Sequence, residues 1–176
     1  EDMLPYERQT VDLYQLCGEI CERLQQRAQA KGVTLALSGQ SAQVNTVRQI
    51  ADEVIYNLCD NAIKYNRPDG SVTVTVSTEA GSVRVQVQDT GIGISPADQR
   101  RVFERFYRVD KSHSRQIGGT GLGLSIVKHG AAYLGVKVGL QSQVGQGSTF
   151  WLEWSAQPLM QQESPMQKRL ETAQNL

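Results

Sequence analysis

The sequence is short of the residues that mark several common kinds of protein. It has only three cysteines and two histidines among 176 residues. The cysteine count is odd and no Cys-x-x-Cys pair occurs, so neither a disulfide framework nor a zinc site is expected. The cysteines are expected to be small buried apolar residues. Apolar runs reach three or four residues at most, which is too short for a membrane-spanning helix.

An excess of charge of one sign is also absent. Eighteen basic side chains match 18 acidic ones, so the formal net charge is zero. A nucleic-acid-binding module normally carries a basic surplus, and we therefore expect no nucleic-acid partner. The length and the 39% hydrophobic content fit one globular domain. The chain begins at Glu1 without a Met or a leader segment, which indicates an excised fragment rather than a secreted protein.

Hydrophobic periodicity predicts three helices. An apolar stripe over residues 13–30 predicts the first, which Gly32 is expected to end. Asn45 is expected to cap the second, over about 46–66. The third is expected from about Gly121 to Leu134.

Alternating residues predict the strands. The valines of 72–76 and 83–87 predict a hairpin, and further strands are expected at 33–37, 136–143 and 148–154. Ser95 and Pro96 are expected to open a short helix. The sum is an α+β, two-layer sandwich in which a mixed, mostly antiparallel sheet of about five strands packs on three helices. Residues 156–176 are polar and are expected to form a tail outside the domain of residues 1–155.

The second helix carries polar residues on a face that is separate from its core stripe. Asn57, Asn61 and Lys64 fall within roughly 60° of arc, with Tyr65 at the edge. Amide oxygens suit a Mg²⁺ held mostly by phosphate and water, and lysine adds charge for phosphate. The alternative is an ordinary solvated face. The residues expected to face water on the far side are Asp52, Tyr56 and Asp60.

Eight of the sixteen glycines gather in three short places, at 91–93, 118–123 and 145–147. Asp89 precedes the first and can accept a hydrogen bond from an exocyclic amine, or it can close its strand in an Asx turn. The second place opens a helix, where backbone N–H groups favour anions. The cations just upstream form either a phosphate-binding cluster or a solvated loop over about 107–120; they are Arg105, Arg108, Lys111 and Arg115.

In this order the motifs resemble the catalytic and ATP-binding domain of bacterial sensor histidine kinases, from about Thr10 to Trp154. Residues 57–65 resemble the N box, 89–93 the first glycine box, and 103–108 the F box. Residues 119–124 and 145–150 resemble the later glycine boxes. The family has the Bergerat sandwich fold, which it shares with gyrase, heat-shock chaperone and mismatch-repair ATPases.

The resemblance implies ATP and Mg²⁺ as cofactors and a role for each motif. Asn61 would bind the metal, Asn57 and Arg105 would serve catalysis, and Asp89 would receive the adenine amine. Thr149 would lie near the adenine. The full set implied to bind ATP is Asn57, Asn61, Lys64, Tyr65, Asp89, Gly91, Gly93, Ile94, Tyr107, Arg108, Lys111, Arg115, Gly119, Thr120, Gly121, Leu122, Gly123 and Thr149.

One difference from the related ATPases bears on mechanism. They carry a Glu four residues before the metal-binding Asn, and that Glu polarises a water for hydrolysis. Here the position is Asn57, which cannot accept a proton. The resemblance therefore implies a site that holds ATP without rapid hydrolysis and waits for another nucleophile.

The family's phosphoacceptor histidine lies in a separate dimerisation domain. Neither His113 nor His129 has its sequence context, so both are expected to be surface residues. The resemblance implies a protein-histidine kinase that works with that dimerisation domain and with a response regulator downstream. It implies a cytoplasmic domain of a membrane-anchored sensor, with the fragment monomeric and making no membrane contact itself. The alternatives are a solo serine kinase and a non-catalytic nucleotide-binding regulator of the same fold.

Overall fold

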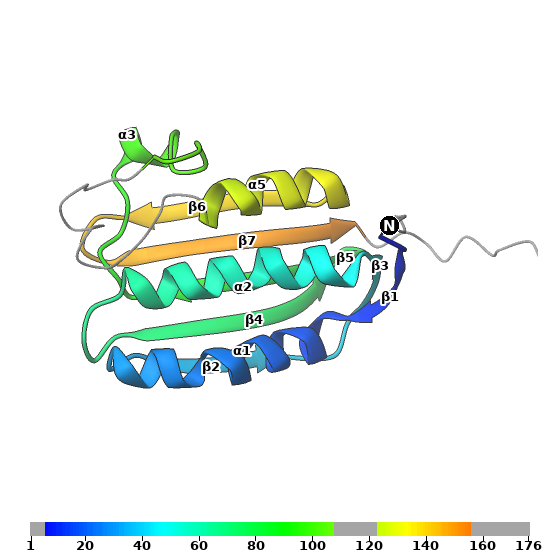
Figure 1. Ribbon diagram of the computed structural model, residues 1–176, viewed down its shortest axis with the longest axis horizontal. Coiled ribbons are helices and arrows are strands. Elements are labelled where there is room, and N and C mark those ends of the chain that lie inside the picture. Colours follow the sequence, from blue (N-terminus) through cyan, green and yellow to red (C-terminus); the bar gives the residue numbers. More distant parts are fainter. Residues whose placement is uncertain (1–5, 108–122, 156–176) are drawn as a thin grey trace, which may run out of the picture.

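Three long helices cover one face of a five-stranded sheet in the computed structural model (Figure 1). The structure describes residues 6–107 and 123–155. The helices are α1 (Leu13–Ala30), α2 (Arg48–Lys64), α3 (Pro96–Gln99) and α5 (Gly123–Leu134). The strands are β1 (Gln9–Asp12), β2 (Thr34–Gly39), β3 (Gln43–Thr46), β4 (Ser71–Glu79), β5 (Ser82–Asp89), β6 (Lys137–Gln143) and β7 (Gly147–Ser155).

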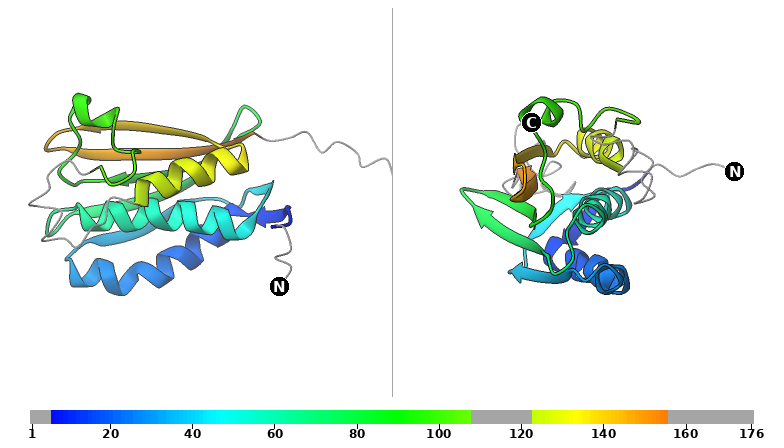
Figure 2. Two further views of the ribbon diagram at one scale, coloured as in Figure 1. Left: turned by 45° about the horizontal axis from the view of Figure 1, so that its top comes forward. Right: turned by 90° about the vertical axis from the view of Figure 1, so that its left-hand side faces the viewer.

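The main sheet has the strand order β2-β4-β5-β7-β6. Only β2 and β4 are parallel, and every other neighbouring pair is antiparallel. Figure 2 shows the helices on one side of this sheet and none of the long helices on the other. The expected two-layer sandwich with a mostly antiparallel sheet is therefore confirmed.

Alternation along the strands builds the core. Val72, Val74 and Val76 of β4 are completely buried, whereas Thr73 and Thr75 between them are half-buried on the other face. The facing strand β5 repeats the pattern with three more valines. Leu13, Leu16, Ile20 and Leu24 supply the matching stripe of α1. Strands with period two and helices with period 3.6 thus place their apolar residues in one layer between them.

The small sheet of β1 and β3 was not expected from the sequence. Its two strands pair antiparallel, with Thr10 opposite Asn45. The prediction that Asn45 caps the second helix is therefore wrong, because Asn45 lies within β3. Helix α2 begins two residues later than expected, and its N-cap residue, Val47, makes no side-chain capping hydrogen bond.

The other helix boundaries agree with expectation where the structure describes them. Asp12 caps α1 by accepting hydrogen bonds from Tyr14 and Gln15, and Gly32 beyond its end has φ +67°. Ser95 caps α3 through the backbone N–H of Asp98. The described part of the third helix begins at Gly123, and the expected start at Gly121, the loop over 108–120 and the tail over 156–176 lie outside the described residues. None of the described helices is long and apolar enough to cross a membrane.

The three cysteines are buried and free, as expected. Burial raises the pKa of Cys21 to about 11 and raises those of Cys17 and Cys59 as well. Neutral thiols are poor nucleophiles and poor metal ligands. These cysteines therefore act as small core residues between α1 and α2.

Gly130 lets α5 pack closely on α2. A Cβ atom at this position would lie 2.4 Å from a methyl of Val54 and 3.4 Å from a methyl of Ile50. The sequence suggested only that Gly130 would fray or bend its helix. Its position shows instead that the missing side chain allows the two helices to approach.

Two helical glycines give a matched test of this close packing. We expect Gly130→Ala to destabilise the fold by about 1 kcal/mol net, because overpacking exceeds the gain in helix propensity. At Gly18 in α1 a Cβ would meet only a methyl of Leu37, at 3.6 Å. Gly18→Ala should therefore stabilise the fold by up to about 1 kcal/mol. Urea unfolding of both variants measures the difference, and a Gly130→Ala protein as stable as Gly18→Ala would contradict the packing role.

Candidate nucleotide site

The expected site residues gather where several elements end on one side of the molecule. The C-terminus of α2, the end of β5, the start of β7 and the start of α5 all lie toward the left in Figure 1. Backbone contacts join them: the N–H of Ile92 donates to the carbonyl of Tyr65 at 3.2 Å. The N–H of Gly145 in turn donates to the carbonyl of Ile92 at 2.8 Å. Segments far apart in sequence thus form one rim.

Asp89 is a half-buried acid of this rim. Its Oδ1 accepts hydrogen bonds from the backbone N–H of Gly91 at 2.9 Å and of Ser148 at 3.2 Å. Within the described part of the chain, its Oδ2 has no hydrogen-bond partner. Burial raises the pKa of Asp89 above the usual value, and the two backbone donors oppose that effect. The Asx turn expected as the alternative is present, and it leaves one carboxylate oxygen for a ligand's amine.

Two glycines are required by close backbone approach. Gly147 has φ +114°, and a Cβ there would lie 2.0 Å from the carbonyl oxygen of Asp89. Gly93 has φ +70°, and a Cβ there would lie 2.1 Å from the carbonyl oxygen of Gln143. Both positions combine a left-handed conformation with a neighbour that leaves no room for a side chain. Gly93 of the first cluster therefore packs on the end of β6, and Gly147 of the last cluster packs on the end of β5.

Arg67 joins the same two loops from outside. Its guanidinium donates to the carbonyls of Thr90 at 2.7 Å, Gly91 at 3.2 Å and Gly145 at 2.6 Å. Arg67 is not among the residues that the sequence predicted for the site. No local pattern marks an arginine that binds carbonyl groups 23 to 78 residues away, so only the fold reveals this contact.

Asn57 and Asn61 present oxygen atoms to the start of α5. A Cβ built on Gly123 would lie 3.4 Å from Oδ1 of Asn57 and 3.5 Å from Oδ1 of Asn61. The amide nitrogen of Asn57 donates to the carbonyl of Glu53 at 2.7 Å, which fixes the orientation of the amide. The structure therefore brings both asparagines and the described end of the second glycine box together.

These oxygens fit a magnesium ion that is completed by phosphate and water. Amide oxygens are hard ligands of the type that Mg²⁺ takes, and Mg²⁺ is rarely enclosed by protein groups alone. In the part of the chain that the structure describes, no group of three or more His, Cys, Asp or Glu side chains is placed to hold a metal. A site for this ion thus depends on a ligand that brings its own oxygens.

Lys64 lies beside the asparagines and is paired. Its ammonium is 3.0 Å from Oδ2 of Asp60, one helical turn earlier. Oδ1 of the same carboxylate accepts from Arg27 of α1 at 2.5 Å. The expectation that Asp60 faces water is wrong, because Asp60 is only 7% exposed. The helical wheel missed this because α1 packs against that face of α2.

Ser148, rather than Thr149, is the residue of β7 beside Asp89. Side chains alternate across a strand, so Ser148 shares the helix-facing side with buried Phe150, and Thr149 points to the other face. The hydroxyl of Ser148 lies 2.7 Å from that of Ser142. The hydroxyl oxygen of Ser142 also accepts a hydrogen bond from the backbone N–H of Ile94 at 2.7 Å. The expected place of Thr149 near the adenine stays a prediction.

The F-box residues occupy the outer edge of the site. Phe103 packs edge-on against Phe150, with ring centroids 6.0 Å apart. Arg105 is exposed and lies over the ring of Phe106, 5.4 Å from its centroid. The hydroxyl of Tyr107 donates to Asp98 of the short helix α3. Tyr107 is therefore tied to α3.

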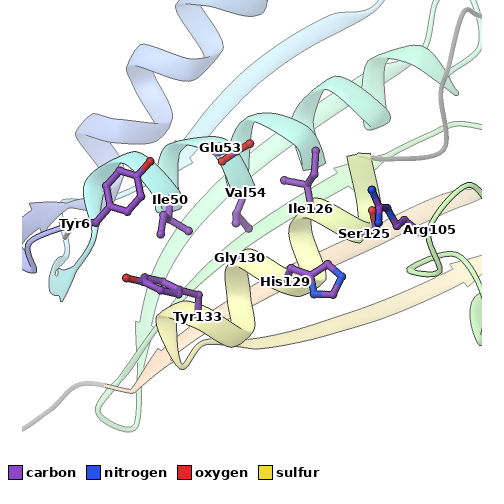
Figure 3. A pocket seen from close by; sticks show the side chains of 10 residues that line it. All are labelled: Tyr6, Ile50, Glu53, Val54, Arg105, Ser125, Ile126, His129, Gly130 and Tyr133. Carbon is purple, nitrogen blue, oxygen red and sulfur yellow. The ribbon is translucent and has the colours of Figure 1, made fainter. Parts of the chain in front are cut away.

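Arg105 also borders a separate groove of about 580 Å³ between α2 and α5 (Figure 3). Gly130 and Val54 lie at its centre, and exposed His129 lies on its wall, as expected of a surface histidine. This groove does not include Asp89 or the asparagines among its lining residues. His113 lies outside the described residues. So do the remaining expected site residues, which are Arg108, Lys111, Arg115, Gly119, Thr120, Gly121 and Leu122.

Comparison with known proteins identifies the family. Residues 46–158 match the model of the histidine kinase-, DNA gyrase B- and HSP90-like ATPases. The chain belongs to this family, and its domain is of the histidine kinase type.

The curated relatives are also histidine kinases. The sensor-like histidine kinase SenX3 of Mycolicibacterium smegmatis is 52% identical over 98 residues, which are 56% of this chain and 26% of the relative. The circadian input-output histidine kinase CikA of Synechococcus elongatus is 36% identical over 159 residues, covering 87% of this chain and 21% of the relative. The chain thus spans about a quarter of the length of these relatives.

Two solved structures are similar in fold. The mycobacterial sensor histidine kinase MprB superposes with a TM-score of 0.73 at 25% identity, covering 86% of this chain and 99% of that one. Full-length ShkA, in a complex with AMPPNP, superposes with a TM-score of 0.74 at 31% identity, covering 85% of this chain and 31% of that one.

The ionised carboxylate of Asp89 should lower the free energy of unfolding, whereas an asparagine at this position should not. Between pH 3.8 and the raised pKa of Asp89, the folded state binds more protons than the unfolded state. The unfolding free energy therefore falls as pH rises through this window, and the ionised group remains destabilising above it. We expect Asp89→Asn to unfold at equal or higher urea concentration than the unmodified chain at pH 7, because the amide oxygen can still accept both backbone hydrogen bonds.

Asp98 provides the control with the opposite sign. Hydrogen bonds from Tyr107 and Ser95 lower the pKa of this carboxyl. Its contribution to stability is present above pH 3.8 and is lost as pH falls through the lowered pKa. Asp98→Asn should therefore unfold at a lower urea concentration than the unmodified chain at pH 7. An Asp89→Asn variant that also unfolds at a lower urea concentration would contradict the destabilising effect assigned to Asp89.

Proposed function

We propose that this chain binds Mg·ATP and transfers its γ-phosphoryl group to a histidine on a separate dimerisation domain, as the catalytic domain of a two-component sensor kinase. The observation that carries the proposal is the pair of amide oxygens of Asn57 and Asn61 facing Gly123, with no carboxylate at position 57. The complex of the similar protein ShkA with AMPPNP, a nucleotide analogue, supports a nucleotide at this site.

The base is recognised at Asp89. Its free Oδ2 accepts from the exocyclic amine of adenine, while Oδ1 stays bound to the backbone. Gly91 and Gly93 let the purine approach the chain. Ile94 supplies partly buried apolar surface nearby, and Tyr65 borders the same loop.

The phosphates lie along the polar face of α2. Asn61, assisted by Asn57, would hold Mg²⁺, which would supply positive charge to the phosphates. Lys64 adds a positive charge. Backbone N–H groups of Gly119, Thr120, Gly121, Leu122 and Gly123 bind phosphate oxygens at the start of α5. Arg105, and from the adjoining segment Arg108, Lys111 and Arg115, are the cations available to the γ-phosphate.

The transfer step needs a nucleophile from another domain. A histidine nitrogen attacks the γ-phosphorus, the bond from that phosphorus to the β–γ bridging oxygen breaks, and ADP leaves. This chain contributes positioning and electrostatic stabilisation. Asn57 cannot take a proton from water, so the site favours transfer over hydrolysis. The same proposal makes the chain a cytoplasmic part of a membrane-anchored sensor that signals to a response regulator.

Labelled ATP tests whether this chain supplies the phosphoryl group and the dimerisation domain accepts it. With γ-labelled Mg·ATP, the chain alone should remain unlabelled because it has no phosphoacceptor context, and addition of the dimerisation domain should give label on that domain's histidine. Intrinsic ATP turnover should stay far below about 1 s⁻¹, the lower end of the usual enzyme range. Stable label on the chain itself, or turnover at that rate, would count against the proposal.

Asn57→Glu is the matched variant for the same assay. A carboxylate at this position can polarise water, so turnover should rise, unless charge crowding with the phosphates abolishes binding. Binding by calorimetry and turnover are therefore measured together on this variant. Unchanged binding with unchanged turnover would show that position 57 does not face the reacting phosphate.

A further inference from the structure

The lysine at the end of α2 is fixed by a carboxylate that a second helix holds in turn. Lys64 pairs with Oδ2 of Asp60 at 3.0 Å, and Arg27 of α1 pairs with Oδ1 at 2.5 Å. The hydrogen bond to Asp60 raises the pKa of Arg27. Both oxygens of one nearly buried carboxylate are therefore used, and their two cations come from different helices.

Lys64 lies between this carboxylate and the metal-facing asparagines. On a helical wheel it is about 40° from Asp60 and about 20° from Asn57. An ammonium has three donors, so Lys64 can keep its ion pair with Asp60 and still donate to a phosphate oxygen. The anchored lysine thus has a defined position and free donors.

Arg27 offsets the negative charge that Asp60 places beside Lys64. Asp60 carries one negative charge and the two cations carry two positive charges, so the triad has a net charge of +1. Without Arg27 the carboxylate would neutralise Lys64 alone, and it would be free to rotate. Both effects lower the attraction of Lys64 for phosphate.

The alternative is that Arg27 and Asp60 only join α1 to α2. A second ion pair joins the same helices in the same manner: Arg23, one turn before Arg27, lies 2.7 Å from Asp52, two turns before Asp60. Arg23 also lies over the ring of Tyr56. This second pair makes no contact with Lys64, so it is a matched control for a purely structural role.

We propose that Arg27 and Asp60 are positioning residues for phosphate binding, acting through Lys64. The inference rests on the proposed function, because it assigns Lys64 to the phosphates of a bound nucleotide. It extends the nucleotide site to α1, a helix that contributes none of the expected site residues.

Calorimetry of Mg·ATP binding to single variants tests the inference, with adenosine as a competing ligand that lacks phosphates. Arg27→Gln should weaken Mg·ATP about three- to tenfold, a coupling typical of residues in one ion-pair network, and Arg23→Gln should change it less than twofold. Neither variant should change adenosine affinity. Asp60→Asn should also weaken Mg·ATP although it removes a negative charge, because Lys64 loses its anchor.

A double variant identifies the residue through which Arg27 acts. In a Lys64→Gln background, Arg27→Gln should have no further effect on Mg·ATP, and Arg27→Lys in the unmodified background should largely restore binding. Equal effects of Arg27→Gln and Arg23→Gln, or tighter Mg·ATP binding by Asp60→Asn, would overturn the inference. Failure of the unmodified chain to bind Mg·ATP would instead overturn the proposed function.

Discussion

The backbone N–H groups of Gly91 and Ser148 both point at one oxygen of the Asp89 carboxylate. These groups come from loops more than fifty residues apart, and their meeting fixes how β5, β7 and the two glycine clusters pack. Gly147 is needed there because its backbone touches the carbonyl of Asp89. This half-buried carboxylate organises two segments with one oxygen, and the proposed function assigns its other oxygen to recognition of the base. Structural and functional requirements therefore coincide in a single side chain.

Helix α2 supports the opposite end of the site through three distinct faces. One face packs into the core beneath α5, where Gly130 permits close contact with Val54. A second presents the amide oxygens of Asn57 and Asn61. The third is bound to α1 through ion pairs, the last of which holds Lys64. The groups proposed to bind metal and phosphate thus come from one rigid support, which is what the proposed phosphoryl transfer by positioning requires.

Residue patterns predicted the periodic elements well and the long-range contacts poorly. The valine alternation of β4 and β5 and the apolar stripe of α1 are local signals, and the structure confirms them. The strands β1 and β3 have four residues each, too few for a clear period, so Asn45 was assigned to a helix cap. Asp60 was assigned to water because a helical wheel carries no information about the neighbouring helix.

The same limit applies to the candidate site. Motif order placed Asp89, Asn57 and Asn61 at the site, and the structure brings the two asparagines to Gly123. It could not reveal Arg67, whose carbonyl partners are distant in sequence, or the backbone hydrogen bond from Ser148 to Asp89. Both contacts join segments that only the fold brings together.

In the proposed site, the second carboxylate oxygen of Asp89 selects the base. The most direct measurement is calorimetric titration of the unmodified chain with Mg·ATP and with Mg·GTP at pH 7. Adenine offers an amine to the carboxylate, whereas guanine offers a carbonyl, and a site that loses such a hydrogen bond rejects the analogue by about 100-fold or more. The account predicts binding of Mg·ATP and a Mg·GTP affinity weaker by at least that factor. Equal affinity for the two nucleotides would contradict it.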